Sequence, residues 1–435
     1  LAGAVTTLAG GGALAGGGAL AGASTPAGTG DSQRSAPAQA PSGLPSPSLQ
    51  SCAWPVSFDI HDSNLLILDS SAAYWDQPIV ATPGLRITLS GTYPSVGYFS
   101  VQTYTPYAAS FSLDGVSSSL PDYRIAPDRG STNPWQHRAA PGGRFQVTVA
   151  AGATPDQTNV LPLPPGTSAA HPGYLVYRLY GDTLSHLAPP TMTVSEGSVS
   201  RRLRHCTTRE PLPLPEKPPA GKAPATPKIF PAGAFVKPAI TADHGALADA
   251  NDAYVWAYVL RPVPSDVLIV SAKAPTFPPG GRPSPWPAPG VDMQYWSLCI
   301  GIGKGSGPTV ANRLPGGRVD YGCRADAATK IDAAGDYHYV IGSEGQRAAI
   351  SQVAGATFLP FSSSATTPRR RPWPLYLLLL RNILVNPAFP DSAQKVTRDS
   401  DPSAAAAAMG PYYPRVSTCP LATLTTKGLA GCPRP

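Results

Sequence analysis

The sequence lacks the short motifs of several common enzyme classes. It contains no G-x-S-x-G pentapeptide, which presents the serine nucleophile of α/β-hydrolases, and no H-E-x-x-H zinc-protease motif. Its six cysteines include no C-x-x-C pair, which argues against a zinc ribbon or a thioredoxin-like redox site. We therefore expect a chain that is not an enzyme, with no catalytic residue, no cofactor and no metal.

Charge and long apolar runs are also scarce. Only 14% of the 435 residues are charged, and the net charge is +7. The basic clusters Arg201–Arg204 and Arg369–Arg371 are short, which favours solvated edges and loops over a nucleic-acid partner. No apolar run approaches the roughly 18–20 residues that cross a bilayer, so no membrane span is expected. The run "LYLLLL" at 375–380 is short enough for a buried strand.

Proline and glycine, by contrast, are abundant and divide the chain. There are 53 prolines and 43 glycines, concentrated in particular segments. Dense proline favours the semi-rigid polyproline II conformation and marks a linker. The expected order of segments is a Gly/Ala/Leu-rich arm at 1–23, a linker at 24–50, a domain at 51–206, a linker at 207–235 and a domain at 236–435.

The two domains look like diverged copies of one unit. Seven short segments recur in the same order, with insertions only between them. The pairs are 69–80 with 249–260, 84–94 with 266–278, 97–104 with 294–301, 122–128 with 320–326, 143–151 with 335–343, 159–166 with 356–363, and 173–182 with 374–383.

Most of these segments alternate apolar and polar residues, as half-buried strands do. Leu85, Ile87 and Leu89 share one face of such a strand. Turn residues separate the segments at short intervals, which is typical of sandwich and barrel folds. The sequence therefore predicts an all-β protein of two tandem duplicated β-sandwich or jelly-roll-like domains. One short helix is expected at 403–410, ending at Gly410.

An even number of widely spaced cysteines suggests disulfides and an extracellular or cell-surface location. Six cysteines allow 15 pairings. A bridge between Cys52 and Cys206 would join the ends of the first domain. The other expected pairs are Cys299–Cys323, on neighbouring repeat segments, and Cys419–Cys432, which closes a short loop.

Several repeat segments also resemble known proteins. The strings "AAYWDQPIVATPGLRITLSGTYPSVGYFSVQTY", "LPDYRIAPDRGSTNPW", "YLVYRLYGD" and "YWSLC" resemble a family of uncharacterised secreted proteins of bacteria and algae. They are similar as well to paired β-domains of unknown function that occur in tandem in many bacterial proteins. The resemblance covers roughly 51–205 and 236–420. It implies a β-sandwich fold and no reaction.

Candidate sites are weak. Six aspartates, two of which would make a glycosidase pair, occur in the first domain: Asp59, Asp62, Asp69, Asp76, Asp122 and Asp128. Asp249, Asn251 and Asp252 are more consistent with an Asx-capped turn than with a calcium site. Trp75 and Trp296 are expected in the core. Trp135 is expected to be an exposed ring, suited to stacking on a sugar.

The N-terminal arm repeats every six residues, which places Leu8, Leu14 and Leu20 at even spacing. On an extended chain these leucines lie on one face, whereas on a helix they point to three sides. An extended arm suits addition to a sheet edge or insertion into a groove. The sequence leaves open whether the arm docks on its own domains or on another subunit.

We therefore expect an extracellular structural subunit, a homo-oligomer that assembles head-to-tail into a filament through its N-terminal arm. O-linked glycans are expected on the linker at Ser42, Ser46 and Ser48, whereas the absence of an N-x-[Ser/Thr] sequon excludes N-linked ones. The alternatives are a secreted glycan-binding protein or glycoside hydrolase with a site between the two domains, and a cell-wall adhesin that uses its basic surface.

Overall fold

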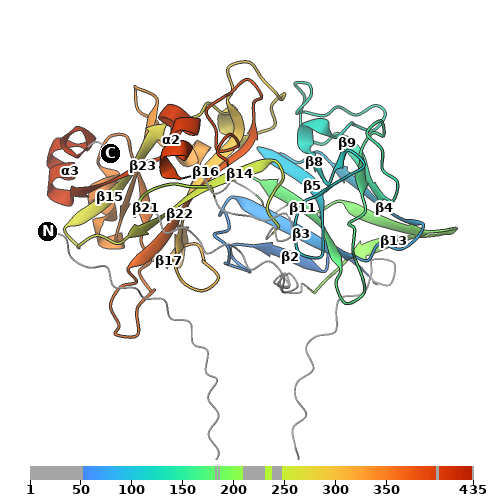
Figure 1. The fold of residues 1–435 in the computed structure, drawn as a ribbon, viewed down its shortest axis with the longest axis horizontal. Coiled ribbons are helices and arrows are strands. Elements are labelled where there is room, and N and C mark those ends of the chain that lie inside the picture. Colours follow the sequence, from blue (N-terminus) through green and yellow to red (C-terminus); the bar gives the residue numbers. More distant parts are fainter. Residues whose placement is uncertain are drawn as a thin grey trace, which may run out of the picture. The chain divides into compact units, whose positions relative to one another are not determined.

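The computed structural model describes residues 52–181, 184, 187–208, 231–237, 247–397 and 401–433. Some residues singled out in the sequence lie outside this part of the chain, namely Leu8, Leu14, Leu20, Ser42, Ser46 and Ser48. The described chain consists mainly of strands, which run from blue and green in the first half to yellow and red in the second (Figure 1). Both halves belong to one compact unit.

The first half is a sandwich of two sheets. One sheet has six strands in the order β1 (Cys52–Ala53), β13 (Val199–His205), β12 (Thr191–Glu196), β4 (Leu85–Thr92), β9 (Arg144–Ala150) and β10 (Val160–Pro162). The other has five in the order β2 (Val56–Asp59), β3 (Ala72–Ile79), β11 (Gly173–Tyr180), β5 (Tyr98–Tyr104) and β8 (Ser119–Pro121).

Alternation along the strands builds the core of this sandwich. Ile87 and Leu89 of β4 face Phe99 and Val101 of β5, and all four side chains are fully buried. Arg86, in contrast, points outward and is exposed. The sandwich predicted from the period-2 pattern is therefore confirmed.

The second half repeats this architecture. One sheet has the order β14 (Asp252–Leu260), β22 (Leu375–Val385), β16 (Met293–Ile302) and β19 (Cys323–Ala325). The other has the order β21 (Ala356–Pro360), β20 (Asp336–Gly342), β15 (Asp266–Lys273) and β23 (Arg415–Pro420). Each of these eight strands has a counterpart in the first half. Even the parallel pairing of β9 with β10 recurs, as β20 with β21.

The register of the sheets corrects several of the segment pairs aligned from the sequence, among them the last one. Arg178 pairs with Ser100 and Tyr74, whereas Arg381 pairs with Ser297 and Tyr254. Arg178 and Arg381 are therefore equivalent, and the last segment is shifted by two residues.

The second correction concerns Asp122, whose counterpart is Asp326 and not Asp320. Asp122 accepts the backbone N–H of Phe99, and Asp326 accepts that of Trp296. Each aspartate also begins a single 3₁₀ turn, Asp122–Arg124 in the first half and Asp326–Ala328 in the second.

In the described chain, α-helices occur only in the second half. The predicted helix is present as α2 (Pro402–Met409), with Asp401 as its N-cap and Gly410 at its C-terminal end. Two short helices not expected from the sequence, α1 (Arg347–Ser351) and α3 (Leu421–Lys427), pack on the outer face of the β15–β20 sheet through Ile350 and Leu424. Within the described residues no helix is long and apolar enough to cross a membrane.

Two hairpins lie outside the main sheets. The first joins β6 (Ser112–Leu113) to β7 (Val116–Ser117), and the second joins β17 (Ala311–Arg313) to β18 (Val319–Tyr321). The turn of the second hairpin contains Gly316 and Gly317, both at φ +83°, a backbone region that favours glycine.

The three expected disulfides are present. Cys52–Cys206 joins strand ends that also pair, because β1 runs parallel to β13. Cys299–Cys323 links directly opposed residues of β16 and β19. Cys419–Cys432 ties β23 to the turn that follows α3. The bridges thus fix one end of the first half and two edges of the second.

Candidate functional site

The surface along which the two halves pack, called the seam below, contains a cluster of buried charges. Arg178 of β11 lies in the first half and Asp249 in the second, and their Nη1 and Oδ2 atoms are 3.1 Å apart. Tyr98 donates its hydroxyl to Asp249 Oδ2 at 2.6 Å. Arg178 Nη2 also donates to the carbonyl of Leu247, at 2.6 Å. Arg178 and Tyr98 of the first half therefore hold the loop that leads into the first strand of the second half.

The same arrangement occurs with the halves exchanged. Arg381 of β22 lies 3.8 Å from Asp69 and donates to the carbonyl of Ile67. Tyr295 and Ser297 of β16 donate their hydroxyls to Asp69 Oδ2, at 2.9 Å and 2.5 Å. The seam thus has an approximate twofold relation, like the interface of a symmetric dimer.

The loops that carry the two aspartates have the same local structure. Ile67 and Leu247 both have positive φ, of 52° and 57°. Three residues before the start of each strand, an aspartate accepts a backbone N–H in an Asx turn: Asp69 accepts that of Ser71, and Asp249 accepts that of Asn251. The Asx turn expected at Asp249 is therefore confirmed, and it serves to position a carboxylate at the seam.

Apolar and aromatic side chains from both halves surround these charges. One buried cluster contains Tyr74, Tyr98 and Tyr180 of the first half together with Tyr295 and Ile383 of the second. Burial raises the pKa of the Tyr98 and Tyr295 hydroxyls well above their ordinary value, and the neighbouring Asp249 and Asp69 raise it further. The tyrosines therefore remain neutral hydrogen-bond donors to the two carboxylates.

The other candidate residues lie apart. Trp135 is fully buried and packs edge-on against Phe99 at 5.1 Å, so the expectation of an exposed ring is wrong. Asn133 holds this loop against the core: its side chain accepts the N–H of Trp135 and donates to the carbonyls of Asp122 and Ile125. Trp296 is in the core, as expected.

Three of the six candidate aspartates are buried away from solvent. Asp69 and Asp122 are completely buried and hold neighbouring backbone or side-chain groups, as shown above. Asp76 is also buried, on β3, while Asp62 is exposed. Asp69 lies near Cys299 and Cys323, with its carboxylate and the two sulfurs all within 4.8 Å of one another. Because these sulfurs form a disulfide, they are not thiolate ligands.

One sheet ends differently in the two halves. In the first half β12 pairs with β4 on one side and with β13 on the other. Among the described strands its counterpart β23 pairs with β15 alone and ends the sheet. Leu421 donates its N–H to the carbonyl of Ser265, the residue before β15. Because N–H groups alternate in direction along an antiparallel strand, those of Val416 and Thr418 point away from β15.

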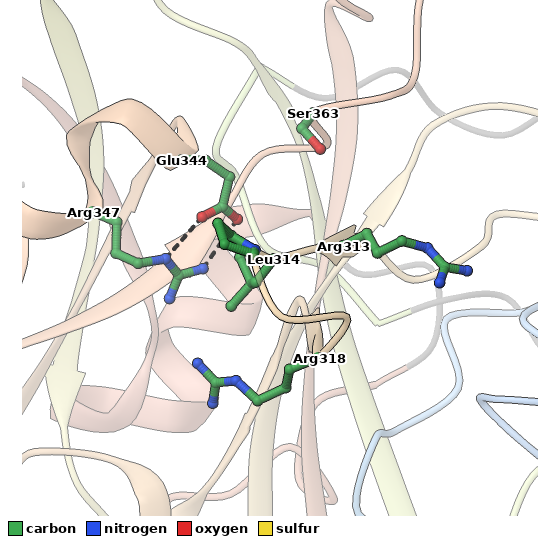
Figure 2. Close-up of a pocket in the computed structure, with 7 residues that line it drawn as sticks. Arg313, Leu314, Arg318, Glu344, Arg347 and Ser363 are labelled. Carbon is green, nitrogen blue, oxygen red and sulfur yellow. Dashed lines mark hydrogen bonds and ion pairs between the residues drawn. The ribbon is translucent and has the colours of Figure 1, made fainter.

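A shallow pocket of about 570 Å³ lies beside the β17–β18 hairpin. Its lining is mainly basic, with Arg313, Arg318 and Arg347 around the side chain of Leu314 (Figure 2). In Figure 2 the guanidinium groups of Arg318 and Arg347 lie on the same side of Leu314, while Arg313 extends to the other side. No motif in the sequence indicated this pocket.

The sequence did hold a signal for the buried seam. Arg178 and Arg381 each interrupt an otherwise apolar strand, in "LVYRLY" and "LLLLRNI". Both arginines are nearly inaccessible, and such a charge inside a strand is normally paired. Their common position in the two repeats becomes apparent only once the register is known.

No family model and no curated protein matches this chain. Among solved structures, it resembles an uncharacterized protein from Burkholderia cenocepacia at 12% identity and a TM-score of 0.47, covering 85% of this chain and 82% of that chain. A protein from Vibrio parahaemolyticus matches at 10% identity and a TM-score of 0.38, covering 82% of this chain and 91% of that one. Neither likeness assigns an activity to the chain.

Proposed function

We propose that this protein is an extracellular structural subunit whose copies assemble head-to-tail into a filament. In this assembly the N-terminal arm of one copy adds as a strand to the outer edge of β23 in the next. The linker that follows the arm carries O-linked sugars in this proposal. The observation that carries the proposal is the outer edge of β23, which pairs with no described strand at the position where the first half has strand β13.

The first half serves as a template for the added strand. There β13 runs antiparallel to β12, with Met192 opposite Leu203 and Val194 opposite Arg201. The residues of β23 equivalent to Met192 and Val194 are Val416 and Thr418, as their partners on β4 and β15 show. An added strand would pair with the same two backbone positions.

The side chains near this edge also suit an apolar partner. Val416 packs partly against the core of the second half, whereas Thr418 is exposed although its pairing partner Leu268 is buried in that core. The core is therefore less completely covered at this edge than in the first half, where Val194 is buried. An extended arm with leucines on one face would cover it.

The disulfides and the seam support a structural role in which the subunit resists mechanical force. All six cysteines are bridged, which fits an oxidising compartment. The paired charges at the seam tie each half to the loop that opens the other. A subunit built in this way transmits force through a single body.

Deleting residues 1–23 from the full chain tests the role of the arm. We expect the full chain to form filaments visible by negative-stain electron microscopy, and the deletion variant to sediment as a monomer. Filaments formed by the deletion variant, or a full chain that stays monomeric, would contradict the proposal.

The variant Thr418→Pro tests the edge itself. Proline removes an N–H that points away from β15, so the ladder within the sheet stays intact. We expect this variant to fold with a thermal midpoint close to that of the original chain and to lose assembly. The matched control Thr418→Val keeps the N–H and should assemble. If Thr418→Pro forms normal filaments, β23 is not the acceptor.

A further inference from the structure

The pocket beside the β17–β18 hairpin contains cationic groups that the rest of the structure does not use. Four arginines surround it or adjoin it, Arg313, Arg318, Arg324 and Arg347, against two carboxylates, Asp320 and Glu344. With four positive and two negative side chains, these six residues carry a net charge of +2.

Arg347 is held rigidly in this pocket. Its Nε and Nη2 atoms donate to Glu344 at 2.8 Å and 3.0 Å, and Nη2 also contacts Asp320. The guanidinium carbon lies 4.3 Å from the centre of the Phe358 ring. Glu344 in turn accepts a hydrogen bond from the buried Asn312 at 2.7 Å. These contacts fix the direction of the remaining Arg347 donor, Nη1.

The guanidinium group of Arg318 lies on the same side of Leu314 as that of Arg347, and Arg318 is exposed (Figure 2). Its backbone carbonyl accepts the N–H of Leu314 at 2.8 Å, which closes the turn through Gly316 and Gly317. Within the described part of the chain, the Arg318 guanidinium has no ion-pair or hydrogen-bond partner. The backbone of this arginine is therefore fixed, while its charged group is free to bind a ligand.

We propose that this pocket binds the anionic groups of an acidic polysaccharide. Arginine presents parallel N–H donors that match the two oxygens of a carboxylate or sulfate. Leu314 and Pro315 line the same pocket and offer an apolar surface to the C–H face of a sugar ring. A volume of about 570 Å³ is in the range of pockets that hold small ligands, which here corresponds to one or two sugar units of a longer chain.

Two variants of the full chain test this site with equal changes in net charge. Arg318→Glu reverses the charge of the arginine whose guanidinium group has no partner in the described structure. In the control Arg202→Glu the reversed charge lies on β13 in the first half, on an exposed arginine that does not line the pocket. Both positions are exposed, so both variants should fold, which thermal unfolding checks.

Binding is measured by isothermal titration calorimetry with oligogalacturonate, dextran sulfate, uncharged dextran and inorganic sulfate. We expect a charged polysaccharide to bind and uncharged dextran not to bind. Arg318→Glu should weaken that binding at least about tenfold, and the control Arg202→Glu by less than about threefold. Preference for galacturonate or for dextran sulfate identifies a carboxylate or a sulfate as the natural anion.

Three outcomes would overturn the site. The first is that neither charged polysaccharide binds. The second is that both variants lose affinity equally, which would indicate general attraction to a basic protein. The third is that inorganic sulfate binds as tightly as the polysaccharides, which would indicate a site for a free ion. None of these outcomes depends on whether the chain forms filaments.

Discussion

Neutralising Asp249 should weaken the seam strongly. Arg178 Nη1 and Asp249 Oδ2 are 3.1 Å apart, and the two side chains are only 3% and 0% exposed. At an effective dielectric constant of ~20, charges at this distance attract by about 5 kcal/mol. Burying both charges offsets most of this energy, but Asp249→Asn leaves Arg178 buried without its counter-charge. We therefore expect the free energy of unfolding to fall by about 3–5 kcal/mol.

A double-mutant cycle separates this pair from simple loss of packing. Arg178→Met should cost a similar amount, because Asp249 then lacks its partner. The double variant removes both charges and should cost at least ~2 kcal/mol less than the sum of the single variants. Unfolding in guanidinium chloride is followed by the fluorescence of the seven tryptophans. The control Asp114→Asn, at an exposed hairpin tip, should change stability by less than about 0.5 kcal/mol.

Two results would refute this account of the seam. If Asp249→Asn costs less than ~1 kcal/mol, the pair does not lie in a water-poor environment. If the costs of the single variants simply add, the two side chains do not interact in solution.

The remaining predictions concern a buried acid and the disulfides. Burial raises the pKa of Asp76 well above its ordinary value, more than the hydrogen bond from the Gln77 backbone lowers it. The folded chain therefore keeps the Asp76 proton at pH values where the unfolded chain has released it. The free energy of unfolding is highest below pH ~4, where both states hold the proton, and it falls as pH rises through the folded-state pKa of Asp76. Asp76→Asn should therefore stabilise more at pH 7 than at pH 4 in denaturant unfolding, and an equal effect at both would contradict this. Replacing Cys52 and Cys206 by alanine opens a 154-residue loop and should cost about 5 kcal/mol, against about 3 kcal/mol for the 13-residue loop of Cys419 and Cys432. The reverse order in thermal unfolding would argue against loop closure as the cause.

The strands and their duplication could be predicted because they depend on local alternation. The segment containing Ile87 and Leu89 has the same period as a half-buried strand, and the structure places it as one. Register depends instead on contacts between distant segments. The equivalence of Arg178 and Arg381 is fixed by pairing with Ser100 and Ser297, which no local pattern records. The error of two residues in the alignment arises from this difference.

Trp135 shows a second limit of the sequence. Its neighbours in "STNPWQ" are polar, which is typical of a surface loop, and the backbone there is indeed irregular. The ring is nevertheless buried, because Asn133 satisfies the loop's polar groups from within. The pocket at Arg318 and Arg347 could not be predicted either, because its residues come from a hairpin and from the start of a helix that are distant in the sequence.

The direction of the proposed assembly follows from how the two halves differ. The seam uses matching surfaces of both halves within one chain, so it leaves no symmetric surface of this kind for a second copy. The first half closes its β12 edge with β13, whereas β23 has no such partner among the described strands. Each chain then has one donor arm and one acceptor edge, which are different surfaces. Contacts of this kind repeat without pairing two copies face to face, and they produce an open filament unless the rotation between copies closes a ring.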